Sequence, residues 1–155
     1  MPTLKRILVN EGWHFKQSTT LGNGMATSYL PVSQFPTVAH LDLLHHGLIK
    51  DPYVDTNEMD SLWVNDANFT YRTVLPSLPP PSSNTKAKVA LVFEGLDTIF
   101  SLYLNNSPIL ETENMHISYR VDFTSHISPS NNWKRGENVL ELRFRNAPEF
   151  AKKKR

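Results

Sequence analysis

The residues of this sequence that could do chemistry are acidic, and they gather in two short stretches. These residues are Asp51, Asp55, Glu58 and Asp60 in the first stretch and Glu94 and Asp97 in the second. Two carboxyl groups hydrolyse a glycosidic bond when the fold holds them about 5–5.5 Å apart for retention, or about 6.5–9.5 Å apart for inversion. Nearness in sequence does not create that geometry, and acidic residues in loops usually form turns or cap helices. We therefore predict no catalytic residue in this chain.

Other catalytic and metal-binding patterns are missing from the sequence. His40 and His46 do not have the i, i+4 spacing of a helical zinc pair. The chain has no cysteine, which excludes disulfides and thiolate zinc sites. It also lacks a nucleophile-elbow motif, a Walker sequence and a dinucleotide-binding glycine pattern. We expect neither a metal nor a cofactor.

Aromatic side chains are a second kind of candidate. Trp13, Trp63 and Trp133 could stack on the apolar face of a sugar ring. Because large aromatic residues more often fill a hydrophobic core, we expect core packing for Trp13 and Trp63.

The charge of the chain is close to balance, with 16 lysines and arginines, 15 aspartates and glutamates, and a formal net charge of +1. Nucleic-acid binding needs clustered cations, whereas the only basic run covers residues 152–155, which we interpret as a solvated tail. No stretch approaches the roughly 20 apolar residues of a membrane helix, and residues 1–10 lack the apolar core of a signal peptide. We expect an intracellular, cytoplasmic protein that binds neither nucleic acid nor membrane.

The order of elements indicates a mainly β protein, because short alternating segments lie between 11 prolines and 6 glycines. The predicted strands cover residues 69–74, 89–93, 99–104, 119–123 and 139–145. Asn105 to Pro108 supplies a hairpin turn, and residues 89–93 are apolar enough for a buried strand. In the last strand Leu140, Leu142 and Phe144 alternate with charged residues and should point inward. Two short helices are predicted over residues 38–46, which Gly47 would cap, and 57–63.

The length of 155 residues fits a single domain with a real core. Residues 76–86 are too rich in proline for a sheet interior and predict a loop insertion between two strands. The residues before this loop alternate too weakly to form a core of their own. We therefore predict one β-sandwich domain over residues 1–155.

Several motifs follow one another in a recognisable order. His40-Leu41-Asp42-Leu43 precedes Asp51-Pro52-Tyr53, and Asn57-Glu58 then Trp63-Val64 continue the series. Further along, the most specific segment is Phe93-Glu94-Gly95-Leu96-Asp97-Thr98. In this order and spacing the chain resembles the N-terminal part of the β-mannosidases of glycoside hydrolase family 2, and its start resembles their intracellular branch.

The resemblance implies a jelly-roll, galactose-binding-like β-sandwich without catalytic residues. In that family the sandwich packs against a catalytic (β/α)₈ barrel that carries the two glutamates of a retaining mechanism. The whole enzyme releases terminal, non-reducing β-D-mannose from β-mannoside oligosaccharides. Because the barrel and its glutamates are missing here, we expect this chain to be inactive alone. A stand-alone carbohydrate-binding module and an interaction domain for a separately encoded barrel remain alternatives.

The resemblance also indicates one region that lies near the sugar. In related enzymes the loop at the position of Asp51 to Glu58 reaches over the sugar pocket. We therefore predict that Asn57 contacts sugar or borders the pocket, with Glu58 and Asp51 beside it. The alternative is that Asn57 caps the helical turn that follows. A Trp-Asp-Trp-Gly sequence that the family normally carries after the last predicted strand is missing, so we expect a sandwich that is incomplete at its C-terminal end, with an unpaired strand edge.

Overall fold

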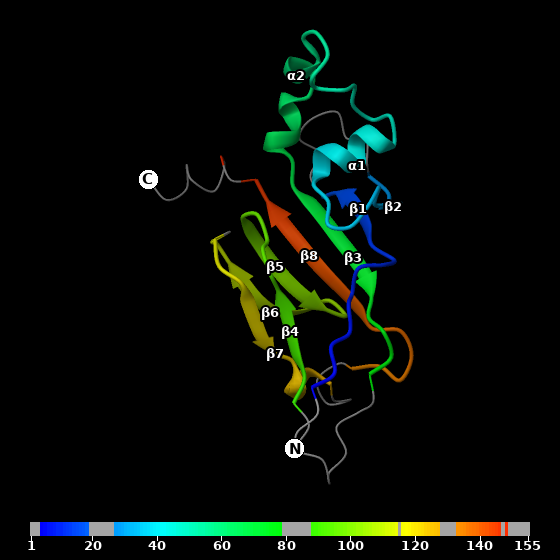
Figure 1. Cartoon of the computed structure of the whole chain (residues 1–155), viewed down its shortest axis with the longest axis vertical. Coiled ribbons are helices and arrows are strands. Elements are labelled where there is room, and N and C mark those ends of the chain that lie inside the picture. Colours follow the sequence, from blue (N-terminus) through cyan, green and yellow to red (C-terminus); the bar gives the residue numbers. More distant parts are fainter. Residues whose placement is uncertain are drawn as a thin grey trace.

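The computed structural model describes residues 4–18, 27–78, 88–114, 116–127, 133–146 and 148. Its elements, in chain order, are β1 (His14–Gln17), β2 (Leu30–Pro31), α1 (Ala39–His45), α2 (Asn57–Asp60), the 3₁₀ helix η1 (Leu62–Asp66), β3 (Phe69–Val74), β4 (Ala90–Phe93), β5 (Ile99–Leu104), β6 (Ser107–Thr112), β7 (Tyr119–Asp122), the 3₁₀ helix η2 (Thr124–His126) and β8 (Val139–Arg145). Figure 1 shows the strands in the lower part and both α-helices at one end. The predicted fold class, mainly β with two short helices, is confirmed.

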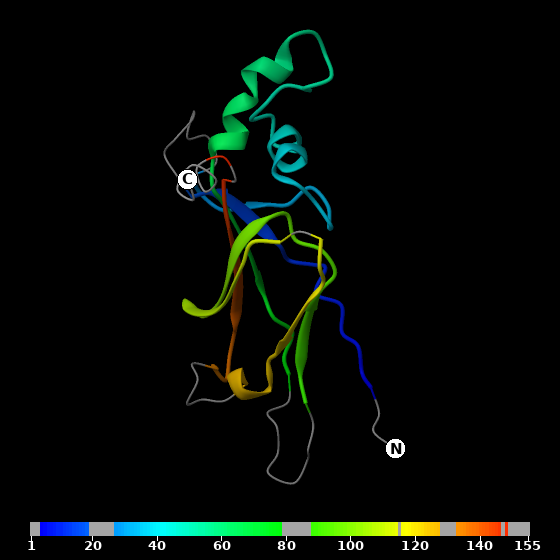
Figure 2. The same ribbon diagram turned by 90° about the vertical axis from the view of Figure 1, so that its left-hand side faces the viewer.

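Two antiparallel sheets form the two layers of a sandwich. The large sheet has six strands in the order β2-β1-β3-β8-β5-β6, and the small sheet consists of β4 and β7. Strands β3, β8 and β5 are neighbours although they are far apart in sequence, as in a jelly roll. Seen from the side in Figure 2, the small sheet lies over one face of the large sheet.

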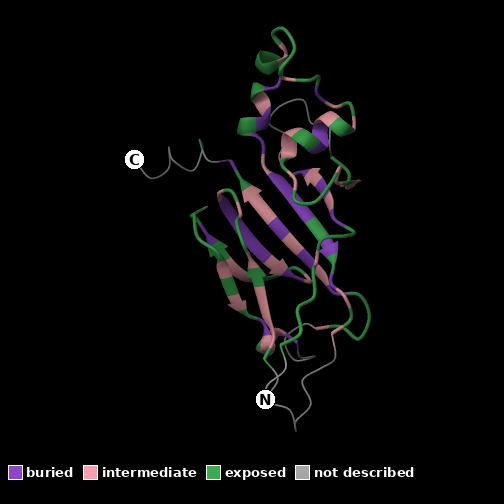
Figure 3. Ribbon diagram, viewed as in Figure 1, coloured by how far each residue is buried: buried purple, intermediate pink, exposed green. Residues whose placement is uncertain are grey.

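A row of aromatic rings runs through the core from β1 of the large sheet to the small sheet. Phe15 of β1 stacks on Tyr71 of β3 with ring centroids 5.9 Å apart, and Tyr71 meets Phe144 of β8 at 5.8 Å. Phe144 in turn contacts Phe100 of β5 at 5.8 Å, and Phe100 meets Tyr119 of the small sheet at 5.5 Å. Such pairs contribute about 0.5–1.5 kcal/mol each beyond the area that they bury. Figure 3 shows the buried residues concentrated along β3, β5 and β8, where this row passes.

Apolar residues of β8 alternate with charged ones and face inward as predicted. The prediction that residues 89–93 form a buried strand is wrong about the burial. Leu140 and Leu142 are only 1% and 4% exposed, and Phe144 points to the same inner face. Residues 90–93 do form strand β4, but they are not fully buried, and Val92 is 51% exposed. The reason is that a sheet of two strands at the outside of a sandwich turns one face to solvent.

The predicted hairpin is confirmed at Asn105 and Asn106, which join β5 to β6. Both asparagines adopt left-handed backbone angles, with φ of 48° and 69°. Positive φ at both central residues is the mark of a type I′ turn, whose twist matches that of the flanking strands. Pro108 lies on β6, an edge strand of the large sheet, where a missing N–H removes little from the ladder.

The predicted helices are present, the second in a shorter form. α1 ends at His45, and Gly47 follows with φ of 66° and donates its N–H to the carbonyl of Leu44 at 2.9 Å, as predicted for a glycine cap. α2 covers residues 57–60 only and continues as the 3₁₀ helix η1. Most of the predicted 76–86 loop and the basic run at 152–155 lie outside the described residues. Within the described ranges, no helix is long and apolar enough to cross a membrane.

Candidate functional site

A fully buried carboxyl group holds α1 against the large sheet. Asp42 is 0% exposed, and its Oδ1 accepts hydrogen bonds from the backbone N–H and the hydroxyl of Ser33 at 2.7 and 2.9 Å. Its Oδ2 accepts a third from the Tyr71 hydroxyl at 3.0 Å. Burial, together with the nearby Asp42, raises the pKa of Tyr71, so the phenol stays protonated and donates. These bonds satisfy the buried acid and fix the helix that precedes the predicted site.

Residues 50–66, which we call the arm, extend from the sandwich beyond the end of the large sheet (Figure 1, top). Ile49, just before the arm, and Val64, near its end, are 9% and 5% exposed and belong to the core. Ser61 is also buried, and its hydroxyl donates to the carbonyls of Asn57 and Glu58 at 3.0 and 3.1 Å. The arm is therefore anchored at both ends while its tip is exposed.

Hydrogen bonds within residues 51–57 close the tip of the arm. The carboxylate of Asp51 accepts the backbone N–H of Tyr53 at 3.0 Å, which is an Asx-turn. The carbonyl of Asp51 accepts the N–H of Val54 at 3.1 Å and the side-chain amide of Asn57 at 3.0 Å. Asp55 completes the bend in a left-handed conformation, with φ of 51°.

The three predicted pocket-border residues therefore lie together on the arm. The alternative that Asn57 caps α2 is wrong, because Thr56 is the N-cap residue and no side chain makes a capping bond there. The Asn57 amide instead spans the loop to Asp51. Asp51 and Glu58 are exposed, and Asn57 is half-buried. Their contact with sugar stays a prediction.

The arm also exposes three large apolar side chains. Tyr53 is 98% exposed, Met59 62% and Leu62 50%. A contiguous apolar patch commonly marks an interaction surface, whereas single exposed apolar residues are common on any protein. The arm thus combines a polar loop with exposed apolar side chains.

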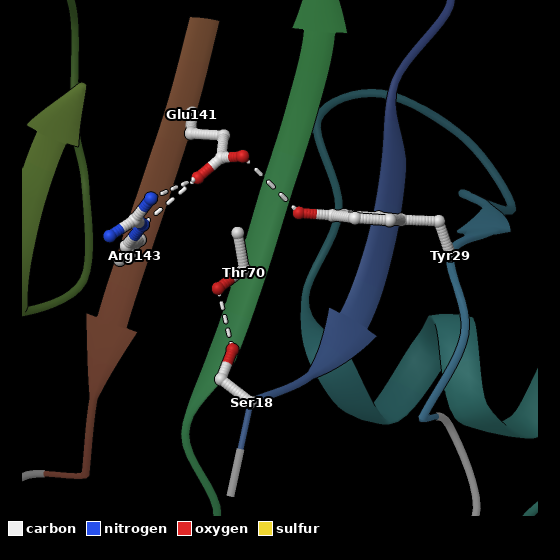
Figure 4. A network of polar contacts seen from close by, with 5 residues as sticks. All are labelled: Ser18, Tyr29, Thr70, Glu141 and Arg143. Atoms are coloured by element: carbon white, nitrogen blue, oxygen red, sulfur yellow. Dashed lines mark hydrogen bonds and ion pairs between the residues drawn. The ribbon is translucent and has the colours of Figure 1, made fainter. Parts of the chain in front are cut away.

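A second polar region covers the outer face of the large sheet, and Figure 4 shows its central part. Glu141 of β8 accepts the Arg143 guanidinium on Oε1 at 2.9 Å from Nε and 2.8 Å from Nη2, and the Tyr29 hydroxyl on Oε2 at 3.4 Å. Burial and the adjacent Glu141 raise the pKa of Tyr29. The hydroxyls of Ser18 and Thr70 form a hydrogen bond of 2.5 Å close by.

Strand register builds this outer face, which the sequence pattern indicates only in part. The pattern of β8 indicated that Glu141, Arg143 and Arg145 face outward. Their partners on other strands follow from pairings such as Thr70 with Arg143 and Arg143 with Ser101. These residues are far apart in sequence, and no short-range pattern brings them together.

The three tryptophans that the sequence offered as sugar-stacking candidates are buried or partly buried. Trp13 is 4% exposed, donates to the carbonyl of Val9 at 2.8 Å and stacks on Phe35, so its predicted core role is confirmed. Trp63 and Trp133 are partly buried against the core. In the described part of the chain, no group of three or more histidine or acidic side chains is placed to hold a metal ion.

Two packed antiparallel sheets with this topology define a galactose-binding-like sandwich domain. The chain matches the family described as "Glycosyl hydrolase 2 galactose-binding domain-like" over residues 13–155. The chain belongs to this family, as predicted.

The relatives found by comparison are much longer glycosidases. Beta-mannosidase B of Thermothelomyces thermophilus is 42% identical over 126 residues, which are 81% of this chain and 14% of that protein. Beta-mannosidase B of Aspergillus terreus is 39% identical over 135 residues, again 14% of its length. The crystal structure of a β-D-mannosidase from Dictyoglomus thermophilum matches 94% of this chain and 16% of its own, with a TM-score of 0.72 and 28% identity. The chain therefore spans about one seventh of the curated relatives that it matches.

Proposed function

We propose that this chain is the N-terminal, non-catalytic domain of an exo-acting β-mannosidase, an enzyme that releases terminal, non-reducing β-D-mannose from β-mannosides. The observation that carries the proposal is the similarity to two β-mannosidases B along more than four fifths of the chain, together with the small share of those proteins that it covers. Hydrolysis then belongs to a separate (β/α)₈ barrel, and the chain itself hydrolyses nothing.

The arm supports a role at the boundary with that barrel. Its exposed apolar side chains, Tyr53, Met59 and Leu62, suit a surface that packs against a larger domain. The adjoining polar loop, in which Asn57 is held to Asp51, carries hydrogen-bonding groups that a sugar could meet. In this arrangement Asn57, Glu58 and Asp51 border the sugar pocket.

Complementation in trans tests the proposal. The chain is co-expressed with Beta-mannosidase B of Thermothelomyces thermophilus from which the matching segment has been deleted. We expect the two polypeptides to co-purify and to hydrolyse p-nitrophenyl β-D-mannoside, whereas each alone does not. Turnover by the chain alone, or no association with the deleted enzyme, would contradict the proposal.

Substitutions on the arm separate docking from sugar contact. Met59→Asp should prevent association, because it places a charge in the apolar contact, whereas Ile117→Asp, at a residue that is 48% exposed outside the arm, should not. Asn57→Ala should leave association intact and raise the KM about fivefold, the effect of losing one hydrogen bond of about 1 kcal/mol. An unchanged KM would remove Asn57 from the pocket border.

A further inference from the structure

The outer face of the large sheet contains a depression of about 230 Å³ outside the arm. Its lining includes Ser18, Thr70, Ser101, Tyr103, Arg143 and Arg145. We propose that this depression is a binding site for one neutral sugar ring, separate from the pocket border on the arm. The inference does not depend on the proposed enzymatic role of the longer protein.

The depression exists because short side chains alternate with long ones across four neighbouring strands. Strand pairing places Thr70, Arg143, Ser101 and Glu111 in one row, on β3, β8, β5 and β6. With strands about 4.8 Å apart, the row spans roughly 14 Å. Thr70 and Ser101 are 3% and 4% exposed and form a floor of hydroxyls, and longer side chains rise beside them.

The groups that surround this floor offer both donors and acceptors. Glu111 accepts hydrogen bonds on Oε1 from Arg145 and from the hydroxyl of Ser101, each at 3.2 Å, and its side chain is still 67% exposed. The Arg143 and Arg145 side chains are 41% and 47% exposed. Guanidinium forks and carboxylates can meet adjacent hydroxyls on a ring, because a hydroxyl both donates and accepts.

Charge balance favours a neutral ligand over an anion. Arg143 is paired with Glu141 at 2.8 Å, and Arg145 with Glu111 at 3.2 Å. Each cation is therefore compensated, so a phosphate or carboxylate would meet little net positive charge. The volume lies below the roughly 300–1,000 Å³ of pockets for drug-sized ligands, which suits a single small ring.

The test is an amide-resolved NMR titration of the chain with methyl β-D-mannopyranoside, with inorganic phosphate as the anionic comparison. We expect saturable shifts at Thr70, Ser101 and Glu111 with a Kd on the order of millimolar. Glu111→Gln should weaken binding about fivefold by removing the charged acceptor, without changing the thermal unfolding midpoint. Glu137→Gln, at an exposed glutamate outside the depression, is the matched control and should bind as the parent does.

Three results would overturn the inference. The first is the absence of saturable shifts up to about 100 mM sugar, a weaker affinity than any specific site needs. The second is a set of shifts confined to the arm, which would place sugar binding at Asn57 and support the proposed function instead. The third is tighter binding of phosphate than of the sugar at the same amides, which would refute the neutral-ligand assignment.

Discussion

At the scale of single residues, the hydrogen bond between Tyr71 and the buried Asp42 is a polar contact whose loss should lower stability. Tyr71→Phe removes the only donor that reaches Asp42 Oδ2 among the described residues. Because the acid is 0% exposed, water cannot easily replace that donor, and we expect a loss of about 1–3 kcal/mol in unfolding free energy. Urea unfolding at constant m-value measures it. Ser33→Ala is the control and should cost less, because the Ser33 N–H still reaches Oδ1.

The same pair predicts the response to alkaline pH. The pKa of Tyr71 is raised in the folded state, mainly by burial and then by Asp42, so the folded protein holds the phenolic proton more tightly than the unfolded chain. This stabilisation is complete below the unfolded pKa of about 10 and is lost as the pH rises above it. Above that pH, the unfolding free energy of Tyr71→Phe should therefore fall less steeply than that of the parent protein. Parallel stability curves for the two proteins would contradict this.

At the scale of elements, the β5–β6 hairpin depends on the left-handed conformation of its turn. Asn106 has a φ of 69°, which costs an alanine about 1–2 kcal/mol and a glycine very little. We expect Asn106→Ala to lower the unfolding free energy by about that amount. Asn106→Gly, the matched control, should stay within about 0.5 kcal/mol of the parent. Equal losses for both variants would show that the asparagine side chain matters more than its backbone angle.

Elements were more predictable from the sequence than the surfaces that they build. The limits of β3, β5 and β8 follow from apolar alternation and from turn residues such as Asn105 and Asn106. The polar row on the outer face depends on which strands become neighbours, and β3 and β8 pair across most of the chain. The bond from Asn57 to Asp51 likewise depends on the path of the arm. The residue type of Asn57 alone suggests only a helix cap.

At the scale of the whole molecule, the two layers are unequal. Only β4 and β7 of the described strands cover the core side of the β8–β5 region, and their inward residues Leu91, Phe93, Tyr119 and Val121 are only partly buried. Among the described strands, each strand of this small sheet has one neighbour. The incomplete C-terminal end of the sandwich, with its unpaired strand edge, stays a prediction.

This imbalance predicts that the isolated chain self-associates through the small sheet. Sedimentation velocity should show association that increases with concentration, because a two-stranded sheet with partly exposed apolar residues favours pairing between copies. Val92→Lys adds a charge at a residue of β4 that is 51% exposed, so it should weaken association without lowering stability. Val74→Lys makes the same change at a 47% exposed residue of β3, a strand with neighbours on both sides, and should leave association unchanged. Equal effects of the two substitutions would mean that general charge, and not the edges of the small sheet, controls association.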